Sequence, residues 1–174
     1  MRRKLLILIP GLVLIAALIA VLAAGFGHDP HALPSMLDGK PAPGFSLQSL
    51  QGETYTLSEL KGRKVLLNFW STWCQPCKIE QPMLDYYAAQ QGPDGVVFLG
   101  VLYGDEPEPA KAFLRRKGGE AYPNLYDPTG RIIVDYGVGG VPETYFINEE
   151  GVVTQKFAGL LPAKDLEAFL ENTP

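Results

Sequence analysis

Cysteine and histidine are scarce in this chain, whose 174 residues contain two of each. A fold stapled by disulfides needs several cysteine pairs, so this protein must be held together by an ordinary hydrophobic core. A structural zinc site needs four ligands, and the two histidines, His28 and His31, precede the cysteines by about forty residues. The scarcity of these residues disfavours both a disulfide scaffold and a zinc site.

Basic residues are also in the minority, with 15 Lys and Arg against 19 Asp and Glu. Three of them, Arg2, Arg3 and Lys4, precede an uncharged stretch over 5–26, so the rest of the chain has 12 basic and 19 acidic residues. That body of roughly 145 residues suits a single domain with a net charge of about −7. Nucleic-acid binding needs clustered positive charge, so no nucleic-acid partner is expected.

The uncharged stretch over 5–26 is long enough to cross a bilayer, which takes about 20 apolar residues. The basic triplet before it should stay in the cytoplasm. We therefore predict a single-pass anchor over 1–26 in the lipid bilayer of the cytoplasmic (inner) membrane, with the N-terminus inside. The catalytic domain would face the periplasmic, extracytoplasmic side. A cleaved signal peptide is the alternative, since Ala23, Ala24 and Gly25 offer a small-residue cleavage site.

Residues 27–43 are rich in proline and predict a linker to a domain over 44–174. The patterns in that domain predict a hairpin over 45–57, a helical turn at 58–62, a buried strand at 64–71, a helix from 74 or 75 to about 91, a buried strand at 96–103, a helix at 109–117, an extended piece at 124–126, a helix at 129–136, a hairpin over 143–157 and a helix at 162–171. This order predicts an α/β fold with a mixed central β-sheet flanked by helices.

The two cysteines form a C-x-x-C pair, Cys74 and Cys77, between a buried strand and a helix. The first N–H groups of a helix carry a partial positive charge, which lowers the pKa of a thiol placed against them. We therefore expect Cys74 to be the nucleophile that attacks a substrate disulfide. Cys77, one turn further in and less exposed, would resolve the mixed disulfide. The pair is thus interpreted as a redox-active disulfide.

Three other uses of a C-x-x-C pair are known to protein chemistry. A purely structural disulfide would close so short a loop that it would constrain the unfolded chain little. A zinc site would have to recruit the distant histidines. Attachment of c-type haem would need a histidine directly after Cys77, where Lys78 stands. Redox exchange is favoured over all three.

Three segments together resemble the membrane-anchored thioredoxin-like proteins of cytochrome c maturation, the CcmG/DsbE group, with ResA and TlpA proteins as relatives. They are PAPGFSL at 41–47, LLNFWSTWCQPC at 66–77 and YGVGGVPETYFIN at 136–148. The resemblance covers about residues 41–172 and implies a thioredoxin-like fold with an N-terminal β-hairpin and a central insertion. Gly44 departs from the group's usual Asp, and Asn68 stands where ordinary thioredoxins carry a buried Asp.

The resemblance also assigns roles near the cysteines. Pro142 would be a cis-proline packed against the disulfide, although most X–Pro bonds are trans and the sequence alone leaves the isomer open. Val141 would offer its backbone to an extended substrate, and Trp73, next to Cys74, could add an aromatic surface for substrate binding. Glu80 and Glu143 match acidic positions of the group's active site.

Carboxylates close to the sulfurs disfavour thiolates, and a destabilised reduced form makes a dithiol more reducing. We therefore hypothesise that Glu80 and Glu143 tune the redox pair and help to move protons. The competing interpretation of Glu80 is a solvated residue on a helix surface.

By resemblance, the enzyme is a protein-disulfide reductase that reduces the CxxCH disulfide of apocytochrome c before haem attachment. Electrons would come from a membrane thiol donor of the CcdA/DsbD type, and no metal or organic cofactor is implied. The alternatives are a general extracytoplasmic thiol reductase of the ResA/TlpA type, a thiol peroxidase and a non-catalytic module that binds apocytochrome.

Overall fold

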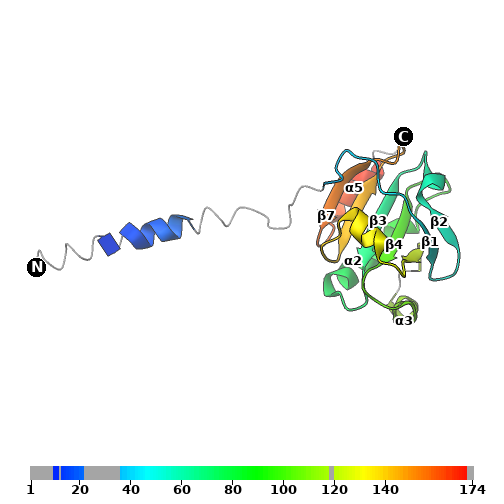
Figure 1. Cartoon of the computed structure of the whole chain (residues 1–174), viewed down its shortest axis with the longest axis horizontal. Helices are drawn as coiled ribbons and strands as arrows, with labels where there is room; N and C mark the ends of the chain where they lie inside the picture. The colour runs from blue at the N-terminus through cyan, green and yellow to red at the C-terminus, as the bar shows by residue number, and fades with distance from the viewer. Residues whose placement is uncertain (1–9, 12, 22–35, 118–119, 172–174) are drawn as a thin grey trace, which may run out of the picture. The chain divides into compact units, whose positions relative to one another are not determined.

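The computed structural model describes residues 10–11, 13–21, 36–117 and 120–171 (Figure 1). The chain divides into two compact units, Met1–Leu33 and Pro34–Pro174. In the first unit, residues 10–11 and 13–21 are helical with exposed side chains. Across the described ranges, no helix combines the length and the hydropathy that a membrane crossing requires. The rest of the predicted anchor, residues 1–9, 12 and 22–26, lies outside those ranges.

The second unit contains a seven-stranded mixed sheet in the order β2-β1-β5-β4-β3-β6-β7. β4 pairs in parallel with β3 and β5, and the other neighbours are antiparallel. The strands are β1 (Ser46–Ser49), β2 (Thr54–Thr56), β3 (Val65–Trp70), β4 (Val97–Leu102), β5 (Asn124–Tyr126), β6 (Glu143–Ile147) and β7 (Val153–Ala158). The predicted α/β fold with a mixed sheet and an N-terminal hairpin is confirmed.

The helices of this unit are the 3₁₀ turn η1 (Leu57–Leu60), α2 (Gln75–Ala88), α3 (Pro107–Lys117), α4 (Arg131–Tyr136) and α5 (Ala163–Glu171). α3 begins two residues before the predicted start, with Pro107 as its first residue. Proline suits a first helical turn because its missing N–H would have no partner there. β5 and α4 stand between α3 and the last hairpin.

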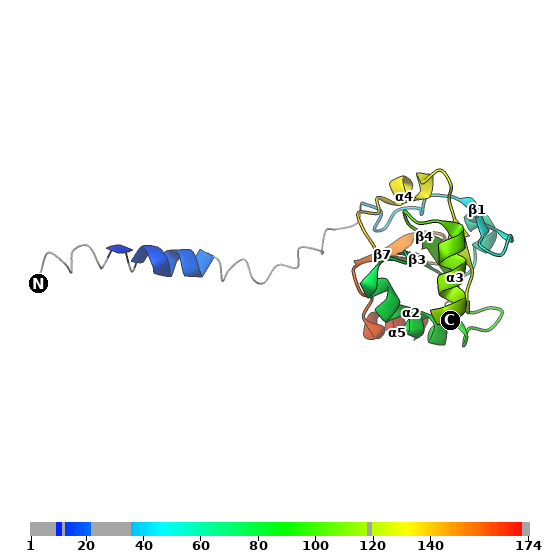
Figure 2. The ribbon, with the colours of Figure 1, turned by 90° about the horizontal axis from the view of Figure 1, so that it is seen from below.

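β3 is buried on both faces and separates two layers of core. Its odd residues, Val65, Leu67 and Phe69, join a cluster with side chains of α4. Its even positions face the opposite layer, where Leu66 packs with side chains of α2 and α5 and Trp70 packs with side chains of α3. In Figure 2, α4 lies on one side of the sheet, with α2 and α5 on the other. β3 ends at Trp70, and α2 begins a few residues later at Gln75, so the C-terminal end of this buried strand lies next to the start of α2.

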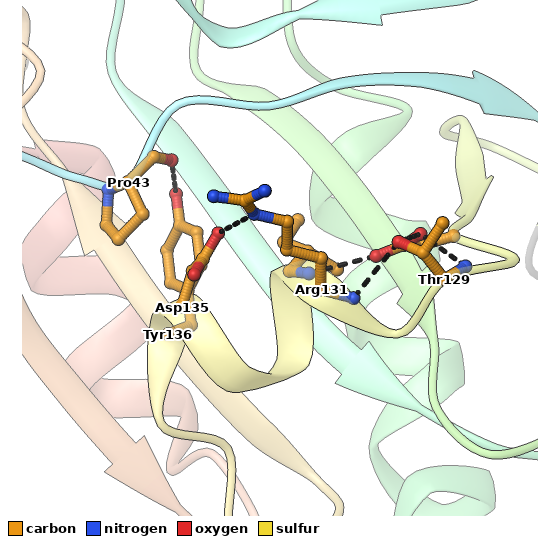
Figure 3. A network of polar contacts seen from close by, with 7 residues as sticks. Pro43, Thr129, Arg131, Asp135 and Tyr136 are labelled. Atoms are coloured by element: carbon orange, nitrogen blue, oxygen red, sulfur yellow. Dashed lines mark hydrogen bonds and ion pairs between the residues drawn. The ribbon is translucent and has the colours of Figure 1, made fainter.

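The folded unit starts earlier than the predicted boundary at residue 44. The Gly39 N–H donates to the Val153 carbonyl at 2.8 Å, and the Ala42 N–H donates to the Gly151 carbonyl at 2.9 Å. At the end of α4, the Tyr136 hydroxyl donates to the Pro43 carbonyl at 2.9 Å (Figure 3). The second half of the predicted linker therefore packs on the domain, because its backbone groups find partners on the last hairpin and α4.

Candidate active site

The two cysteines form a disulfide where β3 leads into α2, and their Cα atoms are 5.3 Å apart. Both are 3% exposed. The prediction that Cys77 is the less exposed of the two is therefore wrong for this oxidised form. Both residues belong to one apolar cluster with Trp70, Leu102 and Phe113, which accounts for their equal burial.

Cys74 is the N-cap residue of α2, and its Sγ accepts a hydrogen bond from the Cys77 N–H at 3.1 Å. The place of the pair between a strand and a helix predicted this position. A thiolate at Cys74 would accept the same hydrogen bond at the positively polarised end of the helix. Pro76, in the first turn of α2, has no N–H that would need a partner there.

Asp105 holds the loop between β3 and Cys74. Its Oδ2 accepts hydrogen bonds from the Thr72 N–H at 2.7 Å, the Thr72 hydroxyl at 2.5 Å and the Ser71 hydroxyl at 3.0 Å. Partial burial alone would raise the pKa of Asp105, but the hydrogen bonds from Thr72, Glu106 and Ser71 bring it below its ordinary value. Asp105 was not among the site residues predicted from the sequence. The sequence does contain a signal for this contact. Ser71 and Thr72 follow β3 and Asp105 follows β4, and two parallel neighbouring strands end at the same edge of the sheet.

The loop before β6 carries a cis peptide bond between Val141 and Pro142. The cis isomer that the resemblance implied is therefore present. The Val141 side chain packs against the apolar cluster that contains both cysteines. Pro142 is buried, and its carbonyl accepts a hydrogen bond from the Gly159 N–H at 2.8 Å. Within the described part of the chain, the backbone N–H and carbonyl of Val141 have no hydrogen-bond partner.

Glu80 lies on α2 one turn after Cys77 and is only 3% exposed. Its Oε1 accepts a hydrogen bond from Asn68 Nδ2 at 2.9 Å, and its Oε2 accepts one from the Leu161 N–H at 3.0 Å. Burial raises the pKa of Glu80 to about 7, although the hydrogen bonds from Leu161 and Asn68 act in the opposite direction. Glu80 is therefore a buried carboxyl close to the cysteines, not a solvated surface residue.

The side-chain amide of Asn68 uses its nitrogen as a hydrogen-bond donor but, within the described part of the structure, does not use its oxygen as an acceptor. Its Nδ2 donates to Glu80 Oε1 and to the Thr144 hydroxyl, both at 2.9 Å. Its Oδ1 is buried and has no partner among the described residues. If the amide rotated by half a turn, Oδ1 would face Glu80. It would then accept a hydrogen bond from the protonated carboxyl of Glu80. Asn68 can thus serve either the charged or the neutral form of Glu80.

Glu143 is 5% exposed and connects the cis-proline loop to β7. Its Oε1 accepts a hydrogen bond from the Gly139 N–H at 3.1 Å. Its Oε2 accepts one from the Tyr145 hydroxyl at 3.2 Å and forms an ion pair with Lys156 Nζ at 2.8 Å. Burial raises the pKa of Tyr145 above its ordinary value, with Glu143 adding to the shift. The negative charge of Glu143 is therefore balanced by Lys156, a partner that the sequence analysis missed.

The two tryptophans near the cysteines differ in exposure. Trp70 is 1% exposed and packs in the core, as expected for a residue within an apolar strand. Trp73 is 58% exposed, and its Nε1 donates to the Gly104 carbonyl at 3.3 Å. Its ring also contacts that of Tyr103, with 6.3 Å between the centroids. Trp73 therefore presents an anchored aromatic surface directly beside the disulfide.

No three His, Cys, Asp or Glu side chains in the described ranges are grouped to hold a metal ion. His28 and His31 lie outside those ranges. What the arrangement can do is open and close the Cys74–Cys77 bond, using a helix N-terminus to stabilise the attacking sulfur. This chemistry on this fold defines the class of thiol–disulfide oxidoreductases with a thioredoxin-like fold.

The chain belongs to the AhpC/TSA family, whose family model matches residues 39–156, and within it to the DsbE group of thiol:disulfide interchange proteins. It is 39% identical over 166 residues to DsbE of Pseudomonas aeruginosa, covering 94% of this chain and 89% of that protein. It is also 39% identical over 137 residues to HelX of Rhodobacter capsulatus, another thiol:disulfide interchange protein, covering 77% and 75%. A crystal structure from Chlorobium tepidum, assigned as DsbE, matches with a TM-score of 0.70 at 29% identity, covering 77% of this chain and 95% of that one.

Proposed function

We propose that this oxidoreductase acts as a reductant in cytochrome c maturation, on the CxxCH disulfide of apocytochrome c. The observation that carries the proposal is the buried carboxyl of Glu80 one turn after Cys77. A negative charge at that place disfavours thiolates, so the reduced pair gives up its electrons readily. The similarity to DsbE and HelX, both thiol:disulfide interchange proteins, supports exchange chemistry at this pair.

Electron transfer would begin with the reduced pair. The Cys74 thiolate attacks one sulfur of the client disulfide, which forms a mixed disulfide and releases the client's first thiolate. The Cys77 thiolate then attacks Cys74 Sγ, which closes the Cys74–Cys77 bond and releases the second client thiolate. Two electrons pass to the client, and its two thiolates each take up a proton. Glu80, with a pKa of about 7, is suited to exchange the Cys77 proton at neutral pH.

Client binding is proposed to use the surface around the disulfide. The backbone groups of Val141, which have no partner among the described residues, would form a short β-pairing with an extended client segment, which gives affinity without selecting a side chain. Pro142 would fix that backbone beside the sulfurs, and exposed Trp73 would add an apolar contact.

We also propose that residues 1–26 anchor the chain in the cytoplasmic membrane, and that the part of 27–43 before Gly39 leads to a periplasmic domain. The uncharged stretch over 5–26 after three basic residues supports this arrangement. Little reducing glutathione is present outside the cytoplasm, so electrons must be delivered. A membrane thiol carrier of the CcdA/DsbD type would be the donor.

The test is a comparison of two oxidised clients, an apocytochrome CxxCH peptide and insulin, with the reduced full-length chain. Reduction of the peptide at a kcat/KM at least about tenfold higher supports cytochrome maturation. Equal rates would instead identify a general thiol reductase of the ResA/TlpA type. A thiol peroxidase is the other alternative to test, because the matching family is AhpC/TSA. Rapid consumption of peroxide by the reduced chain would favour it.

Glu143 gives a prediction about stability. Glu143→Gln should lower the free energy of unfolding by about 2 kcal/mol, because it leaves Lys156 without its ion pair in a site that is largely buried. Urea denaturation measures the loss. In the double variant Glu143→Gln with Lys156→Met, part of that stability should return. An equal or larger loss in the double variant would show that the ion pair is not the cause.

A further inference from the structure

We propose that the groove between α2 and α3 binds an acidic segment of the client polypeptide next to the disulfide. The groove has a volume of about 530 Å³ and is lined by the first residues of α2 and by one face of α3. This inference rests on the proposed function, since it describes a chemical feature of the client. The volume of the groove falls in the range of pockets that hold small ligands or short peptide segments.

The groove is a positively charged place on a negatively charged domain. Lys78, Arg116 and Lys117 line it, and none of them forms an ion pair within the described part of the chain. Lys111, also on α3, differs because it pairs with Glu108 at 2.8 Å. Because the body of the chain carries more acidic than basic residues, an unpaired basic cluster there is complementary to a negatively charged partner.

The groove leads to the sulfurs. Thr72 and Gln75, which flank Trp73 and Cys74 in the sequence, form part of its wall. Phe113 also lines it and packs in the same apolar cluster as the disulfide. A chain segment lying in the groove would therefore have residues only a few positions away within reach of Cys74. This continuity with the reacting bond favours a client polypeptide over an anionic lipid surface.

Asp105, which is hydrogen-bonded to Thr72 in the groove's wall, is already engaged. Asp105 accepts three hydrogen bonds from Ser71 and Thr72, which keep its Oδ2 turned toward the backbone of that loop. The three basic side chains therefore remain available to the carboxylates of a client. Arg116 can bind a carboxylate through two parallel hydrogen bonds, which Lys78 and Lys117 cannot do.

The test uses two peptides that share one C-x-x-C disulfide and differ only in the neighbouring segment, which carries three Asp in one and three Ser in the other. With the full-length chain, the double variant Arg116→Glu with Lys117→Glu should lower kcat/KM for the acidic peptide about tenfold at low salt. The rate for the neutral peptide should change less than twofold. The matched control is Lys164→Glu, a charge reversal at an exposed position on α5.

Binding is measured separately with cysteine-free versions of both peptides, so the groove is tested even if neither peptide is reduced. Two results support the proposal. The acidic peptide should bind more weakly to the double variant than to the parent chain, and its binding to the parent chain should be lost at high salt. Equal binding of both peptides by parent and variant would overturn it. Loss of binding to anionic-lipid vesicles with unchanged peptide binding would overturn it too, because the groove would then face a membrane. Failure of reduction with intact acidic-peptide binding would contradict the proposed function alone.

Discussion

The Cys77→Ser variant, once reduced, should accumulate as a covalent complex with its client. Cys74 can still attack the client disulfide through the sulfur at the start of α2. Without Cys77, nothing within the chain can displace the client from Cys74, so the mixed disulfide persists. Turnover should fall by at least about a thousandfold. Intact-mass spectrometry of the unreduced mixture would show a species of the summed masses.

Cys74→Ser is the matched control for this experiment, since it also leaves one cysteine in the pair. It should form no complex, because Cys77 lacks the N-cap position that stabilises a thiolate. A complex in the Cys74→Ser chain and none in the Cys77→Ser chain would reverse the assigned roles. The equal burial of the two residues in the disulfide does not decide between them, so this comparison does.

Glu80→Gln should make the protein more stable above pH 7 and leave its stability almost unchanged near pH 4. The folded protein holds the Glu80 proton up to a pKa of about 7, whereas the ordinary value is 4.5. The favourable contribution of that proton is complete below pH 4.5 and is lost as the pH rises through 7. The difference corresponds to about 3 kcal/mol in the free energy of unfolding at pH 8.5.

Gln suits this site because Asn68 can rotate its amide. Oδ1 of Asn68, now without a partner among the described residues, would then accept from the Gln side-chain N–H, and the Leu161 N–H would still donate to the Gln oxygen. Urea denaturation between pH 4 and 8.5 measures the effect, with Glu150→Gln at an exposed turn as control. A parallel pH dependence of parent and Glu80→Gln chains would contradict the burial argument.

The same variant should also be a weaker reductant. Above pH 7 the Glu80 carboxylate disfavours the thiolates of the reduced pair, and its removal should raise the reduction potential. Near pH 5.5 Glu80 is mostly protonated, so the potentials of parent and variant should converge. Glu143→Gln should shift the potential less, because Lys156 already balances the charge of Glu143.

Local patterns in the sequence were enough to place the strands, the helices and the redox pair. β3 is a continuous apolar run and is buried throughout, and the C-x-x-C pair follows it at the start of α2. Glu80 is three residues after Cys77, a spacing that puts both on neighbouring turns of one helix. These features depend on contacts close in the chain, which periodicity and spacing can report.

The missed features depend on contacts between distant segments. Lys156 lies opposite Tyr145 only because a bulge after Phe146 shifts the register of β6 and β7. In a regular hairpin with Ile147 opposite Val153, a different residue would occupy that place, since a slip by one residue changes the face of every side chain. The Leu161 N–H that holds Glu80 comes from the segment before α5, and no pattern marks a backbone group as a partner.

A redox titration of the full-length chain tests the central claim most directly. The chain is equilibrated in dithiol buffers of defined potential, and its free thiols are counted by alkylation and intact-mass spectrometry. The account predicts one reversible two-electron transition between the Cys74–Cys77 disulfide and two free thiols, at a potential that rises in Glu80→Gln above pH 7. A disulfide that never opens, or opens without closing again, would contradict it.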